Sequence, residues 1–170
     1  MLDSLTRDHR HLANLADRLE ACLDDDGPLV AMRIGQLRCA LAHEAVRHTL
    51  VAERLVYRTL AARDPALFAQ HGEMFPCLRT DQFLQRLERH IHRWDAPAVQ
   101  ADRMTHAADT RELLSQLRRR MELEEQLLYP RFRALEGVGA VRQRRRARSP
   151  IGIKRQPLSA SGKPVEHHPA

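Results

Sequence analysis

Two similar segments of the chain carry histidine and glutamate side chains, which can bind a metal ion. The segments span residues 48–60 (HTLVAERLVYRTL) and 120–132 (RMELEEQLLYPRF), and they align at an offset of 72 residues. Imidazole and carboxylate groups are ligands that suit iron and related transition metals. The repeat therefore predicts two copies of one helical unit. Identical residues occupy three matched positions: Glu53 and Glu125, Leu55 and Leu127, and Tyr57 and Tyr129.

The spacing of these residues resembles that of the hemerythrin-like (HHE cation-binding) four-helix bundles, whose unit is a His followed four residues later by a Glu. Neither copy has the whole unit, because Ala52 follows the first His and Arg120 precedes the second Glu. The opening of the chain is similar as well, since an Asp-His pair at His9 is followed by a leucine. The resemblance covers roughly residues 1–136 and implies an all-α, up-down-up-down four-helix bundle.

The resemblance also implies a cofactor and a class of function. In the family, His and carboxylate side chains from four helices converge on a non-haem di-iron centre, which binds oxygen or nitric oxide or acts in redox sensing or repair. Matched residue by residue, the resemblance assigns the role of metal ligand to His9, His48 and Glu124. Glu53 is one position beyond the family carboxylate, and we include it as a fourth candidate metal ligand.

Ligands of one metal site must lie at one height along the bundle, and a helix rises about 1.5 Å per residue. By this rise, His9 lies about 21 Å before the first predicted turn and His48 about 28 Å after it, so the two can meet. Across the second turn, Glu53 and His71 are plausible neighbours. Three further carboxylates have compatible positions: Glu44, Glu73 and Glu125.

The other histidines lie at a different height along the bundle or outside the apolar faces of the helices. His90, His92 and His106 lie close to the third predicted turn, whereas the ligand residues of the last helix lie about 30 Å beyond it. We predict that these three side chains are solvated at a helix end. His11 and His43 are predicted to lie on the surface.

Arg120 leaves two interpretations of the site open. A fixed cation opposes the binding of a second cation, and its guanidinium would readily pair with Glu124 or with a bound anion. One interpretation is an incomplete iron site that holds one ion or two. The other is a metal-free core in which His9 and His48 hydrogen-bond to buried carboxylates.

Four stretches with apolar residues at steps of three and four predict the helices that position these side chains. We expect them at about 2–23, 29–62, 66–94 and 98–136, with a kink near Pro76 and a kink or an early end at Pro130. The chain has 170 residues, of which only 4% are aromatic, and this suits one all-α domain packed by aliphatic side chains. We therefore divide it into a bundle, 1–136, and a disordered tail, 137–170.

The tail carries most of the positive charge. Residues 137–170 hold eight Lys and Arg residues against one acidic residue, and the run 142–148 (RQRRRAR) is the densest part. Such a segment is predicted to be disordered and to contact nucleic acid weakly and without sequence preference, through the phosphates.

Several classes of protein are disfavoured. The three cysteines are scattered and lack CxxC spacing, and the chain shows neither an apolar leader nor a run of 18 apolar residues. We therefore expect a cytoplasmic protein without membrane contact. No phosphate-binding loop, HExxH motif or activated nucleophile is evident, so we predict that it is not an enzyme.

These observations together predict a cytoplasmic hemerythrin-like protein with an incomplete non-haem iron site. If iron is bound, the expected ligand is a small gas, oxygen or nitric oxide. The alternative is a metal-free helical bundle with a regulatory role, which binds a protein partner.

Overall fold

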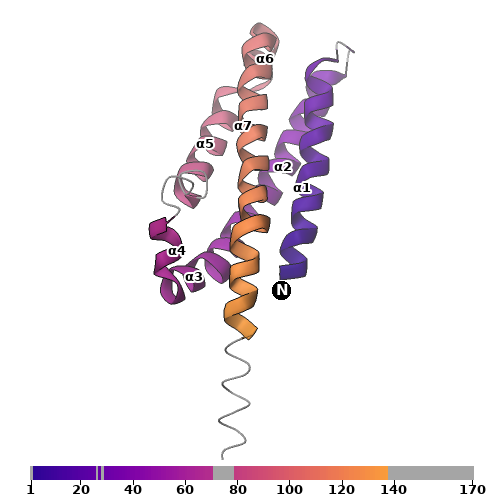
Figure 1. Ribbon diagram of the computed structural model, residues 1–170. Helices are drawn as coiled ribbons and strands as arrows, with labels where there is room; N and C mark the ends of the chain where they lie inside the picture. Colours follow the sequence, from indigo (N-terminus) through magenta and orange to yellow (C-terminus); the bar gives the residue numbers. More distant parts are fainter. Residues whose placement is uncertain (1, 26, 28, 71–78, 138–170) are drawn as a thin grey trace, which may run out of the picture.

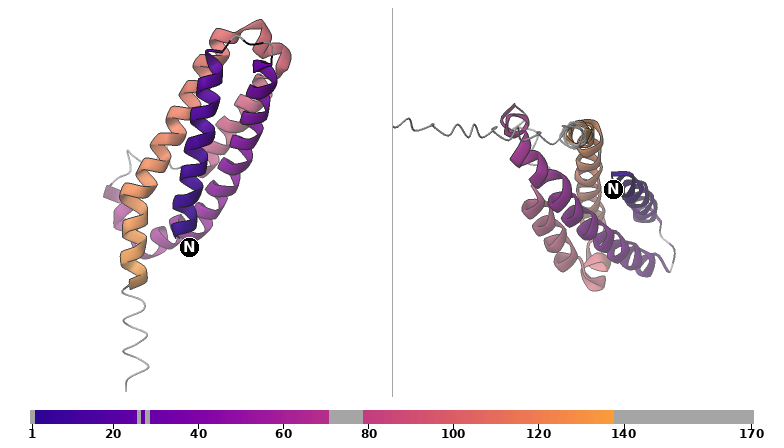
Figure 2. Two further views of the ribbon diagram at one scale, coloured as in Figure 1. Left: turned by 90° about the vertical axis from the view of Figure 1, so that its right-hand side faces the viewer. Right: turned by 90° about the horizontal axis from the view of Figure 1, so that it is seen from below.

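The computed structural model describes residues 2–25, 27, 29–70 and 79–137. Four long helices lie side by side within this part of the chain (Figures 1 and 2). They are α1 (Leu2–Leu23), α2 (Val30–Ala52), α5 (Thr80–Arg93) and α7 (Arg103–Leu123). Both α1 and α5 pack against α2 and against α7. Successive long helices run in opposite directions, so the predicted all-α, up-down-up-down bundle is confirmed.

Short helices lie at the two ends of the bundle. At the end that holds the N-terminus are α3 (Arg58–Arg63) and α4 (Pro65–Gln70), and at the opposite end is α6 (Ala96–Ala101) (Figure 1). The carboxylates of Asp95 and Asp102 each accept a hydrogen bond from a backbone N–H three residues later, at 2.9 and 3.0 Å. These caps begin α6 and α7.

Two single π-helical turns follow α2 and α7 directly. They are η1 (Glu53–Tyr57) and η3 (Glu124–Leu128), so both fall within the repeated segments. The backbone N–H of Tyr129 bonds to the carbonyl of the first residue of η3, five residues back. The helix then continues through Pro130 to residue 137, so of the two alternatives predicted at Pro130, a kink or an early end, the early end is wrong. The shift in hydrogen bonding at η3 comes just before the proline, which lacks an N–H.

The other helical segments fall within or next to the predicted ranges. The segments α2, η1 and α3 are continuous from residue 30 to 63, close to the predicted 29–62. The predicted fourth helix is divided at Asp102, where α7 begins anew. The third predicted helix corresponds to α4 and α5, and Pro76 lies outside the described residues. Of the predicted tail, only Gly137 is described, and it still belongs to a helix.

Two clusters of apolar side chains fill the bundle. The larger cluster is built by α1, α2, α5 and α7 towards the end that holds α6. The smaller cluster gathers the start of α1 with residues of η1, α3, α4, η3 and the helix that follows. His9 and His48 lie between the two clusters along the chain, and Glu124 follows the first residue that the last helix gives to the smaller one; the three side chains are 3%, 1% and 0% exposed. Apolar packing on both sides thus fixes the height of this polar layer.

A second buried polar group lies between α5 and α7. His90 and His106 are buried, so the prediction that they are solvated is wrong. Both rings lie within hydrogen-bonding distance of the Thr110 hydroxyl, at 3.0 and 3.3 Å. The buried indole of Trp94 stands edge-on to His106 at 5.3 Å between ring centres and covers this group. The exposure of His92 confirms the prediction for that side chain.

None of the described helices combines the length and the apolar character needed to cross a bilayer.

Candidate metal centre

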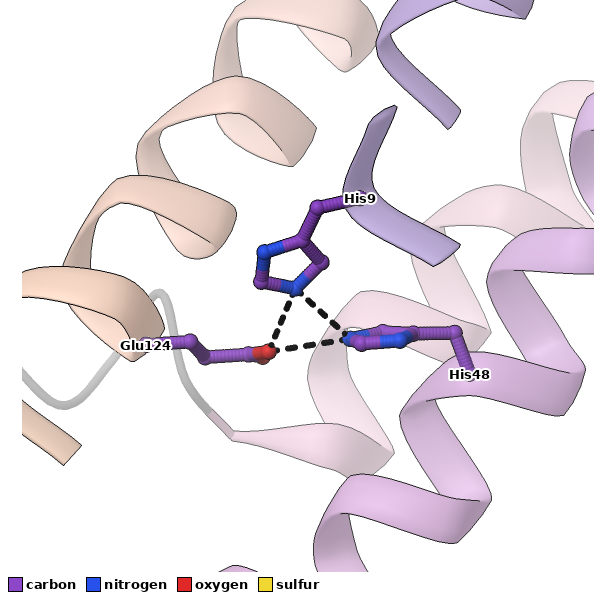
Figure 3. Close-up of side chains that lie close together, drawn as sticks. All are labelled: His9, His48 and Glu124. Atoms are coloured by element: carbon purple, nitrogen blue, oxygen red, sulfur yellow. Dashed lines mark hydrogen bonds and ion pairs between the residues drawn. The ribbon is translucent and has the colours of Figure 1, made fainter. Parts of the chain in front are cut away.

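Three ligand atoms from three helices converge in the polar layer (Figure 3). The Nε2 atoms of His9 and His48 lie 3.0 Å apart. Oε2 of Glu124 lies 3.0 Å from the first nitrogen and 2.9 Å from the second. Among the described residues, no other set of three His, Cys, Asp or Glu side chains brings its ligand atoms within 4.8 Å of one another.

These separations fit a single metal ion. Two ligand atoms at about 2.1 Å from an ion and at right angles to each other are about 3.0 Å apart. Three such atoms, each close to the other two, occupy one face of an octahedron. Two histidines and one carboxylate on one face are the donor set of many non-haem Fe(II) proteins, and they leave open positions for an external ligand.

The protons on the His9 ring support this assignment. Its Nδ1 lies 2.8 Å from Oε1 of Glu125, to which it donates a hydrogen bond. The protonated ring can donate from both nitrogens, to Glu125 and to Glu124, whereas the neutral ring with its one N–H on Nδ1 keeps a lone pair on Nε2. A cation placed among these atoms would accept that lone pair. A carboxylate that fixes the second nitrogen of a ligand histidine is a regular feature of metal sites.

His48 has a similar neighbour at a longer distance. Its Nδ1 and Oδ2 of Asp8 lie 3.7 Å apart, and both atoms are buried without a hydrogen-bond partner in the described part of the chain. A small approach of the two side chains would satisfy both atoms at once. Asp8 is therefore placed to orient His48 as Glu125 orients His9.

The fully buried side chain of Glu124 carries a negative charge. Burial favours the neutral acid, but hydrogen bonds from His48 and His9 and the charge of Arg120 outweigh it and hold the carboxyl pKa far below its usual range. Burial also opposes the protonation of His9, and the hydrogen bond to Glu124 outweighs this and raises the histidine pKa. A fixed anion is therefore available to a cation in the polar layer.

Arg120 lies against the other oxygen of this carboxylate. Its Nε donates to Oε1 of Glu124 at 3.0 Å, as predicted from the sequence, and the side chain is 1% exposed. Nη2 donates to Thr80 at 3.4 Å, and Nη1 is buried without a hydrogen-bond partner among the described residues. The guanidinium carbon lies 5.4 Å from the ring centres of both Tyr57 and Phe83. The cation is thus held by aromatic faces and by hydrogen bonds.

Two tyrosines complete the surroundings of Glu124, and neither was predicted as a site residue. Tyr57 donates to Oε1, while Tyr129 donates to Oε2 at 2.9 Å and lies 3.2 Å from Nε2 of His9. Burial and the nearby Glu124 charge raise the pKa of both phenols, so both remain donors at neutral pH. Their matched positions in the repeat were the signal that could have identified them.

Other predicted carboxylates and histidines do not join the three ligands. Glu53 accepts a hydrogen bond from the Thr80 hydroxyl at 2.9 Å and faces the start of α5. One residue along a helix turns a side chain by about 100°, which is why Glu53 points away from the position that Ala52 presents. Glu44 pairs with an arginine on the surface of α2. His71 and Glu73 lie outside the described residues.

One of three comparisons with known proteins gives a match, and it agrees with this geometry. The searches of curated proteins and of solved structures give no match to the chain. The family model described as the hemerythrin HHE cation-binding domain matches residues 1–132, a span that contains all three converging ligands. The chain therefore belongs to the hemerythrin HHE cation-binding domain family.

Proposed function

We propose that this protein binds non-haem iron through His9, His48 and Glu124 and reports on oxygen, nitric oxide or cellular redox state. The observation that carries the proposal is the convergence of two imidazole nitrogens and one carboxylate oxygen within 3.0 Å of one another. The family match and the buried negative charge of Glu124 support it.

The donor set suits iron and lacks the thiolates that softer metals such as Cu(I) prefer. It contains nitrogen and oxygen atoms, while the described cysteines, Cys22 and Cys39, lie outside the cluster. Imidazole and carboxylate suit Fe(II) and also Zn(II), whereas thiolates favour Cu(I), so the family resemblance is the reason for choosing iron. When iron is bound, the protein residues on one face leave the other positions to an external ligand. The protein then acts by reversible binding rather than by turnover of a substrate, in a cytoplasmic setting.

Iron loading of matched variants tests the proposal. Purified protein is titrated anaerobically with Fe(II), freed of excess metal and analysed for iron, and its visible spectrum is recorded before and after adding oxygen or nitric oxide. His48→Ala should lose most of the bound iron and the spectral response. His43→Ala, which alters an exposed histidine on the same helix, should retain both. Equal iron retention in the two variants would refute the assignment.

The buried ion pair between Arg120 and Glu124 favours a second candidate function. A carboxylate that is already neutralised by a guanidinium can exist in a stable core without a metal ion. In that case the bundle is a regulatory module that binds a protein partner. Wild-type protein that acquires no iron under the conditions above, yet keeps its helical spectrum, would favour this candidate.

A further inference from the structure

The two oxygens of Glu124 face different partners. Oε2 lies within 3.0 Å of the Nε2 atoms of His9 and His48. Oε1 accepts hydrogen bonds from Nε of Arg120 and from the hydroxyl of Tyr57. A carboxylate that bridges two cations presents one oxygen to each of them. Here the cation at Oε1 is a guanidinium that belongs to the chain.

We infer that Arg120 serves as a built-in second cation, so that the centre takes one metal ion per chain, bound through Oε2 of Glu124. This inference rests on the proposed function, since it specifies how many ions the same centre holds. It departs from the two-ion centre that the family resemblance implies.

The position of Arg120 is fixed by several contacts besides Glu124. The guanidinium lies between the rings of Tyr57 and Phe83, and Nη2 reaches the hydroxyl of Thr80 on α5. An arginine side chain stays charged at all accessible pH values. A second ion at Oε1 would have to displace a buried charge that has no other carboxylate within hydrogen-bonding distance among the described residues.

The described residues around Oε1 also offer no donor set for another ion. Ala52, which stands where the family has a carboxylate, has no ligand atom, and the nearby carboxylate of Glu53 points to Thr80. Tyr57 uses its hydroxyl proton on Glu124. In the described part of the chain, a single set of three ligand atoms is therefore present, and it lies on the histidine side.

The number of bound ions and the coupling between them test this inference. The full-length protein is loaded with Mn(II), and metal content is measured together with the electron paramagnetic resonance spectrum. Wild type should bind one Mn(II) per chain and show the hyperfine pattern of an isolated ion. Two ions per chain with an exchange-coupled spectrum would overturn the inference and leave the proposed function standing. No bound metal, with either Mn(II) or Fe(II), would overturn both.

Variants at position 120 test whether the guanidinium is the cause. Arg120→Lys keeps a cation and should still bind one ion. Arg120→His combined with Ala52→Glu replaces the cation and supplies two ligand groups, so it should admit a second ion, with loss of the isolated-ion spectrum. Ala52→Glu alone, which keeps the guanidinium, should stay at one ion. A folded double variant that stays at one isolated ion, or a folded Ala52→Glu protein that binds two, would overturn the role given to Arg120. Helical circular dichroism and the midpoint of thermal unfolding establish that each variant is folded, and the wild-type measurement requires no substitution.

Discussion

The imidazole of His9 donates through Nδ1 to the carboxylate of Glu125 at 2.8 Å, while its Nε2 faces the metal centre. Glu125 comes from η3, the same π turn that supplies Glu124, and its side chain is 47% exposed. One turn of helix thus provides both a ligand and a group that orients another ligand. The hydrogen bond to Nδ1 selects the tautomer whose Nε2 carries a lone pair.

Replacing Glu125 should weaken metal binding without changing the number of ions. Glu125→Ala removes the acceptor that orients His9, and losses of about 10–100-fold in metal affinity are typical for such partners. Competition with a chelator of known affinity measures the change. Glu122→Ala, which removes another exposed carboxylate just before the same π turn, should leave the affinity unchanged. Equal affinities in the two variants would contradict the positioning role.

Removing one member of the ion pair between Arg120 and Glu124 should destabilise the protein more than removing both. Glu124→Gln leaves a buried guanidinium without its counter-charge, a change that costs about 3–5 kcal/mol in comparable cases. Removing both charges, as in Arg120→Met with Glu124→Gln, should cost less than the sum of the single changes. Urea unfolding in the presence of a chelator measures all three variants and gives the coupling free energy.

The exposed ion pair of Arg119 and Glu122 offers a matched control, on which the same two single changes and the double change can be made. Its charged atoms lie 3.4 Å apart, and both side chains are more than half exposed. Such pairs contribute about 0–1 kcal/mol. A coupling free energy at the buried pair no larger than at this surface pair would contradict the prediction.

The sequence was informative about the ligands because their positions follow from helix periodicity. His9 and His48 interrupt apolar faces at compatible heights, and the repeat pointed to Glu124. The π turns could not be predicted in this way, since a single shifted hydrogen bond leaves no clear mark on an apolar pattern. This is one reason why Tyr57 and Tyr129 were missed and why Glu53 was retained as a candidate.

The burial of His90 and His106 was unpredictable for a different reason. Their heights correctly separated them from the metal centre, but height along an axis does not reveal what covers a side chain. Trp94 packs against His106, and the hydroxyl of Thr110 offers both rings a hydrogen bond, so these polar groups can be buried. Neither contact follows from the spacing of residues along one helix.

The two tyrosines should affect a bound metal differently. Tyr129 bonds to the oxygen that faces the histidines, whereas Tyr57 bonds to the oxygen that faces Arg120. In Co(II)-loaded protein, Tyr129→Phe should therefore shift the visible absorption bands more than Tyr57→Phe. Each change should also cost about 1.5–3 kcal/mol of stability, because one hydrogen bond to a buried charged carboxylate is lost. A larger spectral shift in Tyr57→Phe would reverse the assignment of the two oxygens.

Stability should fall as the pH drops below about 6.5, in part because of His90 and His106. Burial and the charge of Arg38 lower the pKa of each ring from 6.5 to about 4. Between these pH values the unfolded chain therefore binds more protons than the folded chain. The stabilisation that the two neutral rings contribute is complete above pH 6.5 and is progressively lost as the pH falls to about 4. Each histidine contributes up to about 1.4 kcal/mol per pH unit to the slope.

Chemical unfolding at several pH values, with metal removed by a chelator, measures this slope. His90→Gln keeps a partner for Thr110 but cannot titrate, so its free energy of unfolding should depend less steeply on pH than that of wild type. His92→Gln changes an exposed ring on the same helix and should preserve the wild-type slope. Identical slopes in all three proteins would contradict the prediction.

The basic run 142–148 should be responsible for any binding of nucleic acid. It lies outside the described residues, so the prediction rests on its composition: five arginines within seven positions and no aromatic residue for base stacking. Contacts with phosphates alone give weak, sequence-independent binding. On duplex DNA, the logarithm of the association constant should fall with the logarithm of salt concentration, with a slope of about −0.9 per phosphate neutralised.

Truncation after Glu136 isolates this contribution, because it removes the run and leaves the described bundle almost intact. The truncated protein should lose DNA binding at both low and high salt. The helical circular dichroism signal of its bundle and its metal content should stay the same. Fluorescence anisotropy with a labelled duplex of arbitrary sequence measures both proteins. Undiminished binding after truncation would place the contact on the bundle. Salt-insensitive binding by the full-length chain would exclude phosphate neutralisation as its cause, since the release of counterions is what makes such binding depend on salt.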